Sequence, residues 1–183
     1  RRINMTVKIA ITGRLRSGKD TVVDMIEEKL EGKTVRLAFG DKVKEFAHKL
    51  YPNVPRVPKP RKLYQFMNVL RDFDENIWVN QLGITLKQIE DKADNIIITD
   101  LRQTNEEDFC RENGFFIIKV ESPTELRKKR VLLAGEEWNE EFENHPSETT
   151  VDLLKGDVVI TNDGTLEDLE QAVDSLLEKL GDK

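Results

Sequence analysis

The sequence predicts an α/β fold, a three-layer sandwich in which helices flank a parallel sheet of about five strands. Strand-like and helix-like segments alternate from one end of the chain to the other, and this order favours parallel strands joined by right-handed helical crossovers. The strand-like segments are short, rich in β-branched or aromatic residues and mostly continuous in hydrophobicity, as strands covered on both faces are. A sheet buried between two helical layers follows from these observations.

Composition limits the classes of protein to which the chain can belong. Its 183 residues include 29 Lys and Arg against 35 Asp and Glu, a net charge of −6, and 38% of them are hydrophobic. The acidic charge argues against nucleic acid as a partner, and no apolar run approaches the ~20 residues that cross a bilayer. Cys110 has no second cysteine with which to form an internal disulfide. We expect a soluble cytoplasmic protein without a membrane partner, either a monomer or a homodimer.

The elements follow in order along the chain. The predicted strands are Thr6–Thr12, Lys33–Phe39, Asn95–Thr99, Phe115–Val120 and Asp157–Thr161. A first helix is expected to begin near Gly18, and three pairs with capping-box spacing predict later helix starts: Thr104 with Glu107, Ser122 with Glu125, and Thr165 with Asp168. Apolar residues at helical spacing predict a last helix packed on the sheet: Leu166, Leu169, Val173, Leu176, Leu177 and Leu180.

Two stretches interrupt the alternation. Residues 40–91 have helical periodicity broken by a proline-rich segment, and residues 127–145 join a basic run to an acidic one. We read the first as a small helical insertion and the second as a mobile lid on a core of 5–39, 92–126 and 146–183. The residues before Met5 lack the apolar core of a secretory signal, so we place a single domain at 5–183.

The strongest chemical signal lies between the first strand and the first helix. Gly13-Arg14-Leu15-Arg16-Ser17-Gly18-Lys19-Asp20-Thr21 matches G-x-x-x-x-G-K, the phosphate-binding loop (P-loop) of nucleotide-binding proteins. The glycines let the backbone bend tightly, so that its N–H groups converge on phosphate oxygens together with the helix N-terminus. Lys19 then reaches the β- and γ-phosphates. The plain alternative is a glycine-rich turn, but the strand before and the helix after favour a P-loop of an NTPase fold.

The residue after Lys19 departs from the motif. Asp20 stands where a serine or threonine would bind Mg²⁺, and a hydroxyl arrives only at Thr21. A carboxylate is a good magnesium ligand, so Asp20 is a candidate metal ligand and Thr21 is free to bind a phosphate. Asp20 as a plain first-turn acid, stabilised by the helix dipole, is the competing interpretation.

Two further groups of charged residues are expected near the loop. Asp100 follows a predicted strand, at the sheet edge where ligands bind, and is expected to face Mg²⁺ or the attacking group while Arg102 binds a phosphate. A structural ion pair is the alternative. Arg127 and Arg130 lie three residues apart, so both would point at the transferring phosphates when a lid closes, unless they belong to a solvated face. His48 and His145 show no zinc-site spacing.

Several of these segments together resemble the phage and bacterial deoxynucleoside monophosphate kinases, a branch of the P-loop nucleoside monophosphate kinases. The resemblance rests on Ser17-Gly18-Lys19-Asp20-Thr21, Leu37-Ala38-Phe39-Gly40-Asp41, Thr99-Asp100-Leu101-Arg102, His145-Pro146-Ser147-Glu148 and Asn162-Asp163-Gly164-Thr165-Leu166, in family order. It implies transfer of the ATP γ-phosphoryl group to the 5′-phosphate of a deoxynucleotide. The Asp20 variant agrees with this branch and departs from the general motif.

The resemblance also implies roles for individual residues. ATP would be held by residues 13–21, chiefly through Gly13, Arg16, Ser17, Gly18, Lys19, Asp20 and Thr21, and Asn162 would lie near the adenine. The catalytic set would be Lys19, Asp100, Arg102, Arg127 and Arg130, with Mg²⁺ on Asp20 and Asp100. The insertion at 40–91 would bind the acceptor through Lys42, Arg71 and Trp78. Small-molecule nucleotides are the expected partners.

Two alternatives remain open from the sequence. One is a kinase for another phosphorylated acceptor, of the dephospho-coenzyme A or phosphomevalonate type. The other is a regulatory module that binds ATP without acting on a second substrate, against which the arginines of the lid and the large insertion count. A panel of acceptors separates the three functions.

Overall fold

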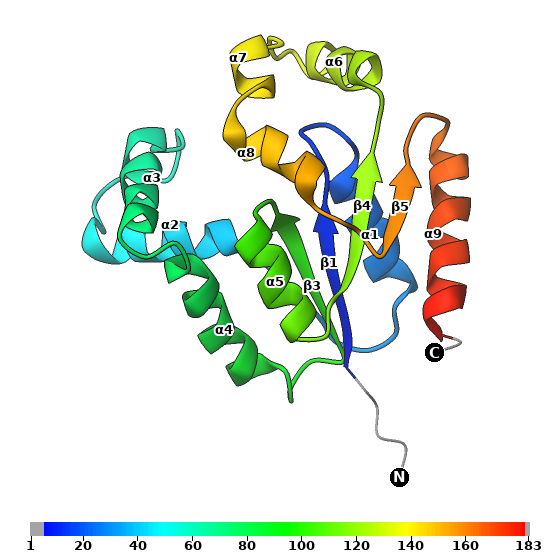
Figure 1. Cartoon of the computed structure of the whole chain (residues 1–183), viewed down its shortest axis with the longest axis horizontal. Coiled ribbons are helices and arrows are strands. Elements are labelled where there is room, and N and C mark those ends of the chain that lie inside the picture. Colours follow the sequence, from blue (N-terminus) through cyan, green and yellow to red (C-terminus); the bar gives the residue numbers. More distant parts are fainter. Residues whose placement is uncertain (1–5, 182–183) are drawn as a thin grey trace.

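A computed structural model describes residues 6–181, so the predicted start at Met5 lies outside the described residues. The strands are β1 (Val7–Thr12), β2 (Thr34–Leu37), β3 (Asn95–Leu101), β4 (Phe116–Glu121) and β5 (Val158–Thr161). They form one five-stranded sheet in the order β2-β3-β1-β4-β5, and every neighbouring pair is parallel. The predicted α/β fold and the number of strands are confirmed, and β1 lies at the centre of the sheet (Figure 1).

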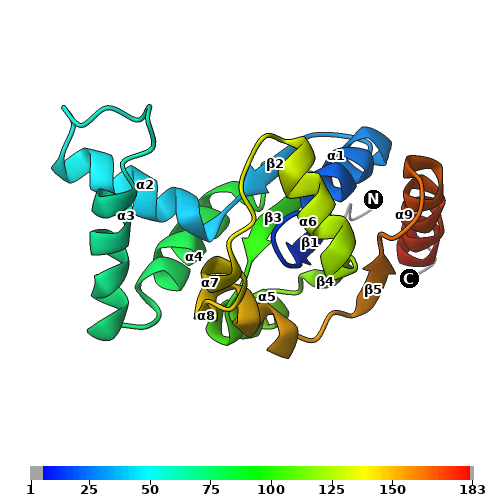
Figure 2. The same cartoon turned by 90° about the horizontal axis from the view of Figure 1, so that it is seen from above.

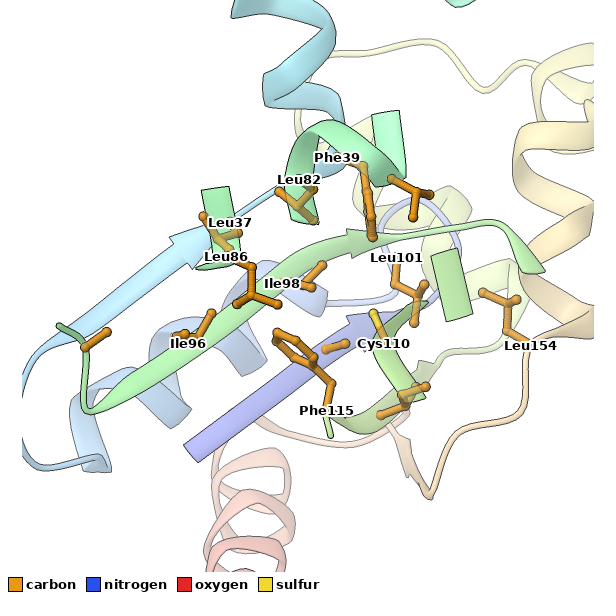
Figure 3. Packing of buried hydrophobic residues seen from close by; sticks show 14 residues of the cluster. Leu37, Phe39, Leu82, Leu86, Ile96, Ile98, Leu101, Cys110, Phe115 and Leu154 are labelled. Atoms are coloured by element: carbon orange, nitrogen blue, oxygen red, sulfur yellow. The ribbon is translucent and has the colours of Figure 1, made fainter. Parts of the chain in front are cut away.

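Helices cover the two faces of the sheet as a sandwich requires. On one face, α1 (Lys19–Lys29) and α9 (Leu166–Gly181) pack on alternate strand residues such as Ile9, Ile97 and Ile118. The other face carries α4 (Ile77–Ile89) and α5 (Thr104–Glu112), which pack on Ile96 and Ile98 (Figure 3). Neighbouring isoleucines of β3 therefore serve opposite cores, which explains why the strand reads as one continuous apolar run.

The second strand ends earlier than predicted. β2 stops at Leu37, and Phe39 begins α2 (Phe39–Leu50) instead of ending a strand. The cause is Asp100, whose carboxylate accepts hydrogen bonds from the backbone N–H groups of Phe39 and Gly40, both at 2.8 Å. An acid from β3 thus satisfies the free amides that open α2.

The predicted helix starts are partly corrected. The box at Thr165 and Asp168 forms as expected, with reciprocal bonds of 2.8 and 3.1 Å. The box of α5 is shifted by one residue, because the helix begins at Thr104 and Glu106 accepts from Gln103 N (3.0 Å). Ser122 does not cap α6 (Thr124–Leu133), since its hydroxyl accepts from Arg130 (3.0 Å) instead.

A helical lobe extends from the β2 edge of the sheet. It consists of α2, α3 (Arg61–Asn68), the 3-10 turn η1 (Val69–Asp72) and the start of α4, with its own small core of Val43, Ala47, Tyr64, Met67 and Trp78. Figure 2 shows α3 standing well away from the sheet. The elements of the lobe begin at Phe39 and overlap residues 40–91, for which an insertion is predicted.

A second group of short elements lies above the carboxyl ends of the strands (Figure 1). It comprises α6, α7 (Glu140–Glu143), α8 (Pro146–Thr149) and the 3-10 turn η2 (Thr150–Leu153). Of the helices formed by residues 6–181, none combines the length and the apolar character that crossing a membrane requires.

Candidate active site

The P-loop crosses the carboxyl end of β1 and enters α1. Its backbone takes the left-handed conformation at Arg16 (φ 59°) and Gly18 (φ 100°), with φ 154° at Gly13. A Cβ at Gly13 would overlap the carbonyl oxygen of Val120, and one at Gly18 would overlap the amide nitrogen of Asn162. The two glycines of the motif are therefore required both by conformation and by space.

The loop leaves donors available for an anion. The hydroxyls of Thr12 and Ser17 are buried and meet no hydrogen-bond partner within residues 6–181. The first N–H groups of α1, beginning at Lys19, also lack intrahelical acceptors, as at any helix N-terminus. Converging amides at the positive end of a helix make an anion site, so this bend has the donors that a chain of phosphates needs.

Lys19 lies over the loop. Its Nζ donates to the carbonyl oxygen of Arg14 (2.9 Å). Burial, and after it the positive charge of Arg102, lowers the pKa of Lys19 to about 8. A phosphate would compensate this buried ammonium, because an opposite charge favours the protonated form.

Arg130 and Asn162 support the loop from its outer side. Arg130 donates to the carbonyl oxygens of Arg16 (3.0 Å) and Asn162 (3.3 Å). The buried amide of Asn162 donates to Ser17 O (2.9 Å). Both residues lie at the P-loop, although Arg130 is bonded to its backbone in this conformation. Arg16 forms an ion pair with Glu136 (2.7 Å), a residue of the predicted lid.

Arg127 points toward the loop from the same helix but is neutralised there. Its guanidinium is only 3% exposed and bonds both carboxylate oxygens of Glu143. Glu143 also accepts from Arg14 (2.6 Å), and Arg14 forms a second pair with Asp152 through Nε (2.9 Å). These arginines hold the pKa of Glu143 below its usual range. Two arginines and two acids therefore join residues 140–153 to the P-loop.

Arg102 also reaches this region. Its Nη1 donates to Glu148, whose other oxygen accepts from Leu15 N of the P-loop (2.8 Å). The Arg102 side chain remains 32% exposed, whereas Glu148 is fully buried. The ion pair that the sequence left open as an alternative thus exists, but the partner is Glu148 and not Asp100.

The predicted metal ligands are oxygen donors on two neighbouring elements. Asp20 is exposed in the first turn of α1, and Asp100 lies at the end of β3, where burial raises its pKa. Mg²⁺ is usually held by one or two carboxylates together with substrate phosphates, so this donor set fits it. Within residues 6–181 no cluster of three or more His, Cys, Asp or Glu is arranged to hold a metal by itself.

The predicted acceptor residues occupy different places in the lobe. Lys42 pairs with Glu45 on α2 (2.8 Å), and Arg71 approaches Glu106 (3.5 Å) with its Nε buried and unpartnered within the described chain. Trp78 is 2% exposed inside the small core of the lobe. A base contact through Trp78 stays a prediction and requires this core to open.

A cavity of about 470 Å³ adjoins the P-loop on the side of β4 and β5. Gly13, Arg14 and Ser17 line it from the loop, Lys119 from β4, and Thr124 and Arg127 from α6. Three cationic side chains, Arg14, Lys119 and Arg127, and two acids, Glu121 and Asp152, line this cavity. Both arginines are paired with acids in this conformation.

Four site residues had no motif of their own in the sequence: Arg14, Glu143, Glu148 and Asp152. Arg14 lies at a variable position of the P-loop. The sequence marks Glu148 only through the His145-Pro146-Ser147-Glu148 resemblance, which gives it no role. No local pattern marks Glu143 or Asp152, because their bonds to Arg14 join residues 129 and 138 apart in the sequence.

Solved structures with the same arrangement support the fold. A shikimate kinase from Acinetobacter baumannii superposes with a TM-score of 0.56 at 12% identity, covering 97% of this chain and 94% of that one. At this identity the similarity concerns the fold alone, an α/β fold with a five-stranded parallel sheet flanked by helices.

Curated sequences and a family model agree with each other. The deoxynucleotide monophosphate kinase of Enterobacteria phage T4 is 30% identical over 124 residues, covering 66% of this chain and 46% of that protein. The enzyme of the same name from Escherichia phage RB69 is 30% identical over 122 residues, 64% of this chain and 44% of its own. The chain therefore spans about half the length of these relatives. Because the model of the family described as deoxynucleotide monophosphate kinase matches residues 60–173, more than half of the sequence, this chain belongs to that family.

Proposed function

We propose that the protein is an ATP-dependent deoxynucleoside monophosphate kinase that transfers the ATP γ-phosphate to the 5′-phosphate of a nucleotide. The observation that carries the proposal is the P-loop itself: a left-handed bend with a buried, unpartnered Ser17 hydroxyl, free helix amides and Lys19 in a chain of this family. In this proposal ATP lies along residues 13–21, and Asn162 adjoins its adenine.

The proposed chemistry is mainly positioning and charge neutralisation. Lys19 would hold the β- and γ-phosphates, while Arg102, with Arg127 and Arg130 after a rearrangement of their present bonds, would offset charge on the transferring group. Asp20 and Asp100 would hold Mg²⁺, whose positive charge would offset part of the negative charge of the phosphates. The acceptor is already an anion, so the chain needs no strong general base.

The acceptor is proposed to bind between the P-loop and the lobe. Arg71 lies 3.5 Å from Glu106, which also accepts from the backbone N–H of Arg102, and this proximity supports Arg71 as a second cation for the acceptor. Lys42 lies on α2, whose N-terminus is bonded to Asp100. We infer nucleotides as the partners, a cytoplasmic location, and a monomer or homodimer as the working state.

An acceptor panel tests the proposed function. Purified protein with Mg-ATP is given each nucleoside and deoxynucleoside monophosphate in turn, and ADP and the phosphorylated product are measured. The expected result is ADP release that depends on a deoxynucleotide. Turnover only with dephospho-coenzyme A or phosphomevalonate, or ATP binding without turnover on any acceptor, would refute the proposal.

The pH dependence of ATP affinity is a second expectation. Lys19 has a pKa of about 8 in the free protein, and bound phosphates would favour its charged form. Binding therefore takes up a proton above pH 8, and the dissociation constant for ATP is expected to be flat below pH 8 and to rise by up to about tenfold per pH unit above it. Calorimetry from pH 7 to 9.5 measures this, with Lys19→Ala as the control that lacks the rise. An equal slope in both proteins would contradict the assignment.

A further inference from the structure

We propose that Glu148 is a positioning residue for phosphoryl transfer, which holds the P-loop and Arg102 at a fixed separation. The inference rests on the proposed function and gives a role to the His145-Pro146-Ser147-Glu148 segment. Glu148 itself touches no reacting group in the proposed mechanism; it acts through Arg102 and through the backbone of Leu15.

The geometry places one carboxylate between two parts of the site. Glu148 is 0% exposed and lies on α8, above the carboxyl ends of the strands (Figure 1). One of its oxygens accepts from Leu15 N of the P-loop at 2.8 Å, and the other accepts from Arg102 Nη1. Leu15 follows β1 and Arg102 follows β3, and these strands are neighbours in the sheet. Glu148 therefore bridges the ATP side and the acceptor side of the proposed site.

The segment around Glu148 is itself anchored. His145 Nδ1 accepts from Ser147 N (3.2 Å) and so caps the turn that carries Glu148. Four residues after Glu148, Asp152 pairs with Arg14 of the P-loop (2.9 Å to Nε). The loop is thus held at two consecutive residues, Arg14 and Leu15, by acids of one short segment. Repeated attachment to the same bend is what a brace for a phosphate loop requires.

Stability alone is a weak reason for such a carboxylate. A buried ion pair contributes little net stability compared with apolar packing, because both charges must leave water. In return the bridge restricts Arg102: one nitrogen is committed to Glu148, while the side chain stays 32% exposed and can still present other N–H groups to a phosphate. Glu148 thus fixes the orientation of the Arg102 guanidinium and leaves its other N–H groups available for a phosphate.

A glutamine at position 148 removes the negative charge of the side chain and keeps its size. Its carbonyl oxygen accepts one hydrogen bond, but its NH₂ group faces a second donor, either Leu15 N–H or the Arg102 guanidinium. Either contact is lost while the side chain volume stays the same. A displacement of a transfer site by about 1 Å can cost about 100-fold in rate, so the loss is expected in kcat and not in the binding of ATP, which the other loop amides retain.

The chain offers a matched control. Glu107 is also buried, accepts from a backbone amide (Lys155 N, 3.1 Å) and pairs with an arginine (Arg111, 2.7 Å), but it lies on the α5 side away from the P-loop. Both donors bond the same oxygen of Glu107, so the glutamine carbonyl of Glu107→Gln can keep both contacts. This variant therefore removes the charge of a buried carboxylate beside an amide and an arginine without touching the proposed site, and it controls for the loss of charge alone.

The experiment compares Glu148→Gln, Glu107→Gln and the unmodified full chain with Mg-ATP and the acceptor that the panel identifies. We expect Glu148→Gln to lower kcat by about 100-fold while the calorimetric dissociation constant for ATP stays within about threefold, and Glu107→Gln to leave both unchanged. Glu148→Asp keeps the charge one methylene shorter and is expected to lose less. If Glu148→Gln fails to fold, as judged by circular dichroism, this aspartate variant carries the test: kcat equal to that of the unmodified chain then overturns the proposal.

A double-variant cycle tests whether Glu148 acts through Arg102. In an Arg102→Ala background, Glu148→Gln is expected to add little to the loss of kcat, because the two residues work as a unit. Fully additive losses, or equal kcat in Glu148→Gln and the unmodified chain, would overturn the positioning role. A chain that binds ATP but phosphorylates no deoxynucleotide would refute the proposed function instead, so the two failures are told apart.

Discussion

Lys19→Ala is expected to remove nearly all phosphoryl transfer and to leave the fold intact. Lys19 stands at the start of α1, and its ammonium is the cation of the P-loop nearest the expected β- and γ-phosphates. Since charge-stabilising groups of phosphoryl-transfer sites contribute about 1,000-fold or more to the rate, the loss in kcat should be at least of that order. Within residues 6–181 the Lys19 ammonium makes one hydrogen bond, to Arg14 O, so little stability depends on it.

The measurement is acceptor-dependent ADP production together with thermal unfolding. Lys29→Ala is the matched control, because Lys29 ends the same helix and pairs with Glu170 and Asp174 far from the P-loop. The control should retain full turnover. Unchanged ADP production by Lys19→Ala would contradict the role given to the P-loop, and with it the proposed site.

Gly13→Ala is expected to destabilise the chain and to abolish ATP binding. The new Cβ would overlap the backbone carbonyl oxygen of Val120 in β4 and would approach Ser17 Oγ to 2.7 Å. Because Val120 O belongs to the buried sheet, it cannot move aside as a flexible side chain would. Strain of this kind costs on the order of 2 kcal/mol or more, and the loop can relieve it only by changing the bend that presents its amides.

Gly114→Ala provides the comparison for this prediction. Gly114 also has a positive φ (75°), but a Cβ there would meet nothing within 4 Å. This variant should show only the conformational cost, roughly 1–2 kcal/mol in denaturant unfolding, with ATP affinity unchanged. Equal ATP affinity in Gly13→Ala and the unmodified chain, measured by calorimetry, would show that the bend does not depend on this glycine.

Patterns of residues close together in the sequence predict most of the fold. The five predicted strands lie within two residues of the observed ones at each end, because a strand between two helical layers is apolar on both faces and reads as a continuous run. The P-loop is also predictable from the sequence, since the G-x-x-x-x-G-K motif indicates both the bend of the backbone and phosphate binding within one short stretch. The early end of β2 at Leu37 and the shifted start of α5 at Thr104 involve two acids, Asp100 and Glu106, whose bonding partners depend on the folded chain.

The sequence by itself determined an α/β sheet, a P-loop and a family resemblance, because each of these rests on residues close together in the chain. Only the tertiary structure decided the partners of the arginines. Arg127 and Arg130 share a helix, yet one binds Glu143 and the other the carbonyl oxygen of Arg16. Glu148 joins Leu15 to Arg102 across 133 and 46 residues of sequence. Charges carry no record in the sequence of which distant opposite charge they will meet, since that choice is made by the packing of strands and helices that brings them together.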